Sequence, residues 1–274
     1  MKISFSNHFY TGLELTDERL NVISYLGYED IEFWTMMPHI DLDDDKSVRT
    51  AFQLLRDAGL RINSYHAPIF KPYREVSRRK LAYITDTDDA VRRETLRFIC
   101  RSIEIMSESG SKIVVVHGDI KDKNDLTGSV SALKKSLKEI CETASRKDTF
   151  VALENTEREL PVRELAGIVE DLNLDNLGIC VDAGHANIFE DAVEAIKTAG
   201  EHLVNIHVSD NDGKGDSHLH PGRGNIRWNE IGVILNKMNY KGSATLEVKS
   251  SNGIDGITYD EVKKLFQATL FPSP

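Results

Sequence analysis

Nine histidine, aspartate and glutamate residues stand near the ends of short β-rich runs or just beyond them. Six of these residues lie near the end of such a run: His66, His117, Glu154, Asp182, His207 and Glu247. His185 follows Asp182 by three residues, and Asp216 and His218 lie beyond His207. Burying this many imidazoles and carboxylates together leaves unpaired charges that destabilise a fold, and a divalent cation removes that cost. The residue types therefore predict a metal site.

The segment 210–224, DNDGKGDSHLHPGRG, holds three aspartates, two histidines and four glycines. Its glycines allow a loop to fold over the mouth of a site. Asp216 and His218 are two residues apart and are expected to point to the same side. Asp210 and Asp212 are expected to support turns or ligands and not to hold the ion. In VDAGH, Gly184 is expected to turn the chain sharply, so that Asp182 and His185 both face inward.

The elements that must position these residues alternate along the chain. Eight short β-rich runs occupy 3–7, 29–34, 61–67, 112–118, 150–156, 177–185, 204–210 and 243–249. Helical apolar spacing lies between them, as at Leu133, Leu137 and Ile140. This alternation predicts an α/β fold, a (β/α)₈ barrel of parallel strands. An open doubly wound sheet is the alternative, but the first run is not followed by a GxGxxG sequence. In a barrel all carboxyl ends of the strands meet at one rim, so the nine residues should converge.

Length and composition set further bounds. A (β/α)₈ barrel takes about 250 residues, so residues 1–274 are expected to form a single domain. The sequence is 40% hydrophobic and 28% charged, as in ordinary soluble proteins. It shows no secretion signal and no apolar run of membrane-spanning length, and its three cysteines lack CxxC spacing. These features predict reduced thiols, a cytoplasmic location and no membrane partner, and they allow a homo-oligomer.

The net charge of −10 disfavours nucleic acid as a partner. A basic track for a nucleic acid would have its best candidate in KPYREVSRRK, residues 71–80. We interpret that segment as a solvated helix face or as a clamp for the phosphate of a small sugar.

Five quoted segments together resemble a known family: VVVHG, ALENT, GICVDAGHAN, NIHVSDNDGKGDSHLHPGRGNI and TLEV. The sequence resembles the xylose isomerase-like barrel superfamily, and within it the sugar phosphate isomerase/epimerase branch. The resemblance runs from about residue 60 to 250 and implies a (β/α)₈ barrel with a metal site at the carboxyl ends of its strands.

Two branches of this superfamily imply different ligand sets. Ketose epimerases hold one metal, often manganese, and the matching residues here are Glu154, Asp182, His207 and Glu247. Apurinic/apyrimidinic endonucleases hold three zinc ions. The matching positions add His66 and His117 beside Glu154 for one ion, and His185, Asp216 and His218 for another. The resemblance thus implies Zn²⁺ or Mn²⁺, with one to three ions.

The sequence departs from both branches. The arginine that ketose epimerases carry six residues after the histidine of strand seven is Gly213 here. The loop after strand seven is shorter here than in the endonucleases, with eight residues between His207 and Asp216.

The first functional hypothesis is a sugar or sugar phosphate isomerase/epimerase that moves a proton through an enediolate. Glu154 and Glu247 would serve as its base and acid, beside a divalent ion that polarises the carbonyl group. His185, His66 and Trp34 are the expected contacts of a carbohydrate substrate. The alternatives are a multinuclear zinc phosphodiesterase of the endonuclease type and a non-catalytic barrel that only binds a metal or a sugar.

Overall fold

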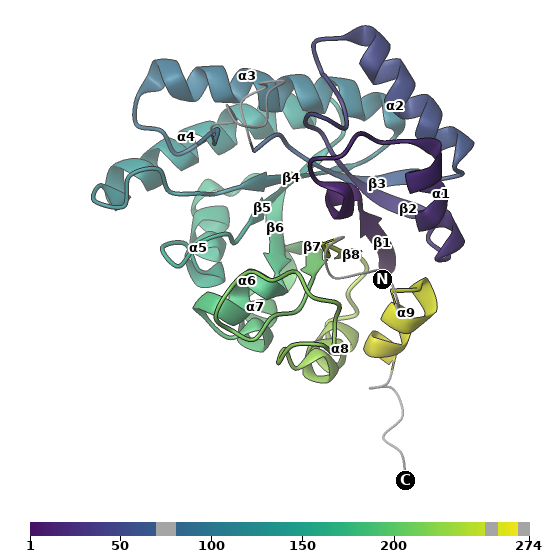
Figure 1. Ribbon diagram of the computed structural model, residues 1–274. Coiled ribbons are helices and arrows are strands. Elements are labelled where there is room, and N and C mark those ends of the chain that lie inside the picture. Colours follow the sequence, from purple (N-terminus) through teal and green to yellow (C-terminus); the bar gives the residue numbers. More distant parts are fainter. Residues whose placement is uncertain (70–80, 250–256, 268–274) are drawn as a thin grey trace.

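The computed structural model describes residues 1–69, 81–249 and 257–267, and within them eight parallel strands close into a barrel (Figure 1). The strands pair in chain order, and β8 returns to β1. They are β1 (Lys2–Ser6), β2 (Asp30–Trp34), β3 (Arg61–His66), β4 (Ile113–His117), β5 (Phe150–Glu154), β6 (Leu177–Asp182), β7 (Leu203–Val208) and β8 (Ser243–Leu246). The (β/α)₈ barrel expected from the alternation is confirmed. Four of the expected runs, near 154, 182, 208 and 246, extend two or three residues past the observed strand ends.

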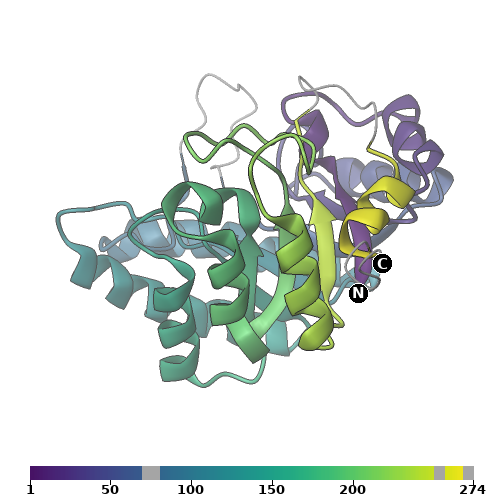
Figure 2. The ribbon, with the colours of Figure 1, turned by 90° about the horizontal axis from the view of Figure 1, so that it is seen from below.

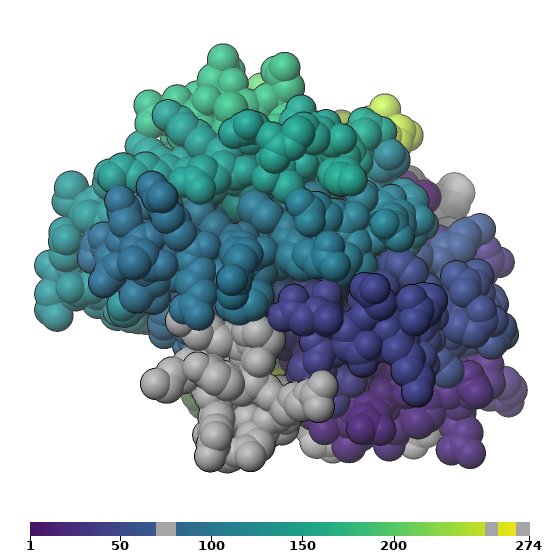
Figure 3. All heavy atoms as spheres, turned by 90° about the horizontal axis from the view of Figure 1, so that it is seen from above, coloured from purple at the N-terminus to yellow at the C-terminus, as the bar shows by residue number. Residues whose placement is uncertain are grey.

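Helices surround the barrel and bury their apolar faces against its outer surface. They are α1 (Asp17–Tyr25), α2 (Asp45–Asp57), α3 (Asp89–Met106), α4 (Leu126–Ser145), α5 (Val162–Leu172), α6 (Ala183–Phe189), α7 (Ala192–Ala199), α8 (Trp228–Lys237) and α9 (Tyr259–Gln267). The blue and teal atoms of α3 and α4 lie side by side in the space-filling view (Figure 3). Within the described ranges, no helix has the length and apolar character that crossing a bilayer requires.

The register of the strands places the expected site residues beside one another. Three neighbouring pairs stand at the same height of the barrel: Trp34 with His66, His117 with Glu154, and Asp182 with His207. Two of these pairs depend on a one-residue shift of register, between Ile31 and Glu32 in one case and between Ile179 and Cys180 in the other. A one-residue slip turns every later side chain to the opposite face of a strand. After the two irregularities, His66 lies beside Trp34 and His207 lies beside Asp182.

The barrel interior beneath the rim is largely polar on one side. Ser4, Glu32, Ser64, Asn205 and Thr245 are each fully buried. They are joined by hydrogen bonds: Ser64 and Asn205 donate to the same oxygen of Glu32, Thr245 contacts Asn205, and Ser4 contacts Thr245. On the other side Val115, Ala152 and Cys180 form a small separate apolar cluster. Ser64 and Asn205 thus satisfy one oxygen of the buried Glu32 carboxylate, and its other oxygen faces Nε2 of His207.

The loop that joins β7 to α8, seen in green at one end of the barrel in Figure 2, is anchored by the buried Asp210. Its carboxylate accepts hydrogen bonds from the backbone N–H groups of Gly222 (2.8 Å) and Ile226 (3.2 Å) and from the indole Nε1 of Trp228 (3.0 Å). Asp210 and Leu219 also exchange backbone hydrogen bonds. The expectation that Asp210 supports the loop is confirmed, and this support fixes the segment that carries Asp216 and His218.

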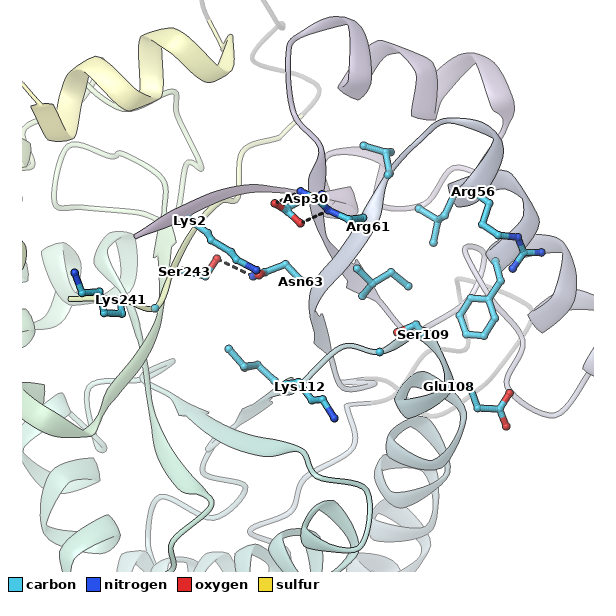
Figure 4. Close-up of a pocket in the computed structure, with 17 residues that line it drawn as sticks. Lys2, Asp30, Arg56, Arg61, Asn63, Glu108, Ser109, Lys112, Lys241 and Ser243 are labelled. Atoms are coloured by element: carbon cyan, nitrogen blue, oxygen red, sulfur yellow. Dashed lines mark hydrogen bonds and ion pairs between the residues drawn. The ribbon is translucent and has the colours of Figure 1, made fainter. Parts of the chain in front are cut away.

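The opposite, amino-terminal end of the barrel carries a depression of about 700 Å³ (Figure 4). Three of the charged side chains that line it, Asp30, Arg61 and Lys112, form ion pairs. Arg61 pairs with Asp30 and Glu29, and Lys112 pairs with Asp148. Asn63 donates to Ser243 at its floor. This end is remote from the nine expected site residues, and we interpret its contacts as structural.

We expect Asp210→Asn to destabilise the protein by about 3 kcal/mol, because an amide nitrogen would face the N–H groups that now donate to the carboxylate. The exposed Asp212, which accepts one local backbone hydrogen bond, provides the matched control. Asp212→Asn should change stability by no more than about 0.5 kcal/mol. Urea unfolding of both variants measures the difference. Equal stabilities would show that the loop does not depend on Asp210.

Candidate metal centre

The carboxylate of Glu154, at the end of β5, is the centre of the rim and is buried. Its Oε2 atom lies 3.2 Å from Nε2 of His66 and 3.2 Å from Nε2 of His117. The other ring nitrogen of each histidine meets an acceptor: His66 Nδ1 lies 2.9 Å from the carbonyl oxygen of Ala67, and His117 Nδ1 lies 3.2 Å from Asp119 Oδ2. Histidines held in this way offer the Nε2 lone pair to a metal ion. The expected grouping of His66, His117 and Glu154 is present.

A second group surrounds the other oxygen of Glu154. One ligand atom from each of Glu154, Asp182, His207 and Glu247 lies within 4.8 Å of the others, and all four residues are buried. His207 Nδ1 lies 2.8 Å from Glu247 Oε2, 3.2 Å from Glu154 Oε1 and 3.7 Å from Asp182 Oδ2. Residues from β5, β6, β7 and the end of β8 therefore converge, as their positions in the sequence predicted.

The third expected group, His185, Asp216 and His218, is gathered less closely. His218 Nε2 lies 2.8 Å from Asp216 Oδ2, but His185 Nε2 lies 3.9 Å from the same oxygen. His185 also turns its Nδ1 atom toward the carbonyl oxygen of Asn155, at 3.0 Å. Among the described residues, the third compact group consists instead of His8, His218 and Glu247.

Gly184 does not act as expected. Helix α6 begins directly after Asp182, which caps it by accepting from the backbone N–H of His185 at 2.7 Å. Gly184 is thus helical, and it makes no sharp turn. A β-carbon at this position would lie 2.6 Å from Ser209 Oγ and 3.1 Å from Asp182 Oδ1. Glycine suits this position because the helix passes close to Ser209, which follows β7, and His185 reaches the rim from the first turn of α6.

Electrostatics couple these groups strongly. Burial works to raise the pKa of Glu154, but His207 and His117 outweigh it and hold the pKa well below its ordinary value. Burial likewise opposes a charge on His117, yet Glu154 and Asp119 raise its pKa well above normal. Burial raises the pKa of Asp182, with Glu154 acting in the same direction. This cluster of buried carboxylates therefore needs positive charge to stabilise it, and either protonated imidazoles or a cation can supply that charge.

The donor set fits a divalent cation. Two ligands of a tetrahedral ion at 2.0–2.2 Å are about 3.4 Å apart. The contacts of His207 with its three carboxylates, 2.8 to 3.7 Å, span that value. Carboxylate oxygens suit magnesium and manganese, and imidazole nitrogens favour zinc. These four residues are able to hold such an ion, and Glu154 is able to share one with His66 and His117.

Glu32, in the middle of β2, was not identified from the sequence. It is fully buried, and its Oε1 lies 3.0 Å from Nε2 of His207. The two atoms are not aligned for a hydrogen bond and neither has another hydrogen-bond partner, so the contact is an ion pair between enclosed groups. The sequence does contain a sign of its position: Glu32 is two residues before Trp34, so the two side chains point to the same face of that strand.

Trp34 lies at the rim, but it is enclosed, with 5% of its surface exposed. Its ring packs between those of His8 and His66, with ring centres 4.4 and 4.5 Å away. Its Nε1 atom is buried without a hydrogen-bond partner. His8 itself was missed, because a single histidine in SNHFY carries no pattern. The basic segment 71–80 lies outside the described residues.

Known proteins are similar to this chain in fold and, over part of its length, in sequence. Residues 20–268 match the family model described as xylose isomerase-like TIM barrel. An uncharacterised protein of Methanocaldococcus jannaschii is 32% identical over 188 residues, which cover 65% of this chain and 64% of that protein. A D-psicose 3-epimerase of Enterocloster bolteae is 29% identical over 135 residues, which cover 47% of this chain and 43% of the relative. The matched part is less than two thirds of either relative's length.

The crystal structure of a D-tagatose 3-epimerase-like protein superposes with a TM-score of 0.82 at 24% identity, over 98% of each chain. That likeness concerns the fold. The family match extends over most of the sequence and includes β2 to β8 with the residues at their carboxyl ends. The chain belongs to the xylose isomerase-like TIM barrel family.

Proposed function

We propose that this protein is a divalent-metal-dependent isomerase or epimerase of a sugar or sugar phosphate. The observation that carries the proposal is the position of two glutamates in one buried group. Glu154 ends β5 and Glu247 directly follows β8, so their carboxylates approach one centre from different sides of the barrel. Relatives that include a D-psicose 3-epimerase and a fructoselysine 3-epimerase support the same class of reaction here.

The two glutamates provide the groups that proton transfer needs. The electrostatic surroundings of both favour the carboxylate form: burial opposes ionisation, but His207 lowers the pKa of each residue. One glutamate takes the proton from the carbon beside the carbonyl group, and the electron pair of the broken C–H bond delocalises to form an enediolate. The other glutamate gains a proton from solvent, gives it to the enediolate carbon and is left as a carboxylate. Positioned general acids and bases contribute about 10² to 10⁴ in rate.

Glu154, Asp182, His207 and Glu247 are the residues that would hold the ion, Zn²⁺ or Mn²⁺. When bound, the ion supplies Lewis-acid polarisation of the substrate oxygens. Trp34, His66 and His185 are the proposed substrate contacts. His185, which reaches the rim from α6 with 16% of its side chain exposed, supports this role most directly.

We expect the protein with Mn²⁺ or Zn²⁺ to incorporate deuterium from D₂O at the carbon next to the carbonyl of its ketose or aldose substrate. Glu154→Gln and Glu247→Gln should each abolish turnover, because glutamine keeps the size of the side chain but does not accept a proton near neutral pH. Deuterium exchange is measured by NMR beside a metal assay on the same sample. Exchange at the wild-type rate in both metal-loaded variants would remove the glutamates from the proton path.

Glu32→Gln should weaken metal binding by about 10- to 100-fold, because it removes the charge that faces the far side of His207. Competition with a chromophoric chelator measures the affinity. Ser64→Ala is the matched control, since it removes a hydrogen bond to the other oxygen of Glu32 and leaves the contact with His207 intact. Wild-type affinity in Glu32→Gln would show that this ion pair does not support the metal.

A zinc phosphodiesterase is the second candidate, favoured by the His66, His117 and Glu154 group at a position for another ion. Several zinc ions would activate a hydroxide and stabilise the departing oxygen. The net charge of −10 and the eight-residue spacing of His207 and Asp216 oppose a nucleic-acid substrate.

We therefore expect no nicking of an abasic-site duplex at the rate of a repair nuclease when zinc is present. A gel assay measures it, with Glu247→Gln as the control for contaminating nuclease. Efficient nicking that disappears in that variant would make the second candidate the better one.

A further inference from the structure

His8 is a buried rim residue that the proposed reaction does not use. It lies in the short 3-10 helix Asn7–Tyr10, directly after β1, and is 7% exposed. Its ring lies between two others, with ring centres 4.4 Å from Trp34 and 4.8 Å from His218. The histidine is therefore held in place by its neighbours and cannot turn to solvent without disturbing both rings.

The Nδ1 atom of His8 faces the carboxylate of Glu247. It has no hydrogen-bond partner, although it is buried. It lies 3.5 Å from Oε1 of Glu247, while Oε2 of the same carboxylate faces His207 at 2.8 Å. A separation of 3.5 Å is longer than a normal hydrogen bond, which spans about 2.7–3.2 Å. It agrees with the roughly 3.4 Å between two ligands of one tetrahedral zinc ion.

His218 completes this arrangement. It contributes one ring nitrogen within 4.8 Å of the ligand atoms of His8 and Glu247. Its Nδ1 is engaged with the backbone oxygen of Glu247 at 2.7 Å, so Nε2 is the nitrogen that would bind a metal. Asp216 Oδ2 lies 2.8 Å from that Nε2 and is within reach as a fourth ligand. Lys249 Nζ, 3.8 Å from the same oxygen, already balances part of its charge, so Asp216 is the weakest member.

We propose that His8, His218 and Glu247 bind an additional zinc-type cation, with Asp216 able to complete its coordination. Glu247 would then bridge two ions through its two oxygens, as the geometry of Glu154 allows between the His66 and His207 groups. The site replaces the expected set of His185, Asp216 and His218. It goes beyond the proposed sugar reaction and shares only Glu247 with the ion that the reaction needs.

The test counts zinc ions and needs no substrate. Wild type and variants are equilibrated with excess Zn²⁺, freed of unbound metal by gel filtration and analysed by inductively coupled plasma mass spectrometry. His8→Phe keeps an aromatic ring between Trp34 and His218 but removes the ligand nitrogen. We expect it to retain one zinc ion fewer per chain than wild type. His8→Asn, which is smaller, should show the same loss if the phenylalanine variant does not fold.

Two other variants make the result specific. His202 lies in Gly200–His202 before β7, away from the rim, and His202→Ala should keep the wild-type count. His185→Ala should keep it as well. An equal count in wild type and the folded His8 variant overturns the proposal, and so does loss of an ion in His185→Ala with retention in His8→Phe. The zinc count does not depend on sugar turnover. It therefore tests this site even if the protein is not an isomerase, and a negative zinc result does not contradict the isomerase proposal.

Discussion

The buried carboxylate of Glu154 is the interaction on which the rim depends. One of its oxygens faces His66 and His117, and the other faces His207 and, at 3.7 Å, His185. A carboxylate enclosed in this way is costly unless positive charge surrounds it. The ends of β3, β4, β5 and β7 and the start of α6 are held around this one group, and the same requirement for positive charge makes the rim suitable for a metal ion.

The backbone meets this requirement through register. Each site histidine must point inward at the same level as Glu154, and inward direction alternates along a strand. The irregularities after Ile31 and Ile179 adjust two neighbouring strand pairs so that His66 and His207 satisfy this condition. Local departures from regular pairing are often found beside active sites, where they redirect a side chain. Here they connect the geometry of the sheet to the chemistry of the rim.

The polar side chains in the barrel interior below the rim support His207. Barrels of this type are usually filled by branched apolar side chains. In this protein Ser64 and Asn205 hydrogen-bond to Glu32, and Glu32 faces the far nitrogen of His207. A buried polar network is stable when its members are satisfied, and it then fixes the orientation of the groups it touches. The interior thus supports the histidine at the centre of the four-residue group from below.

The sequence by itself determined the barrel and the nine residues at its rim, because both are local properties. Eight alternating runs specify eight βα units, and the position of a residue at the end of a run is enough to place it once the topology is known. Only the tertiary structure decided which residues of distant strands become neighbours, because those contacts form when the barrel closes. Glu32 stands on β2 and His8 lies just after β1, both far in sequence from His207 and Glu247, and they become neighbours only when the sheet closes. Gly184 reads as a turn in the sequence but is a close approach between α6 and the end of β7. The sequence alone does not show which atoms a β-carbon at Gly184 would meet, because the nearest of them, Ser209 Oγ, lies in the segment after β7.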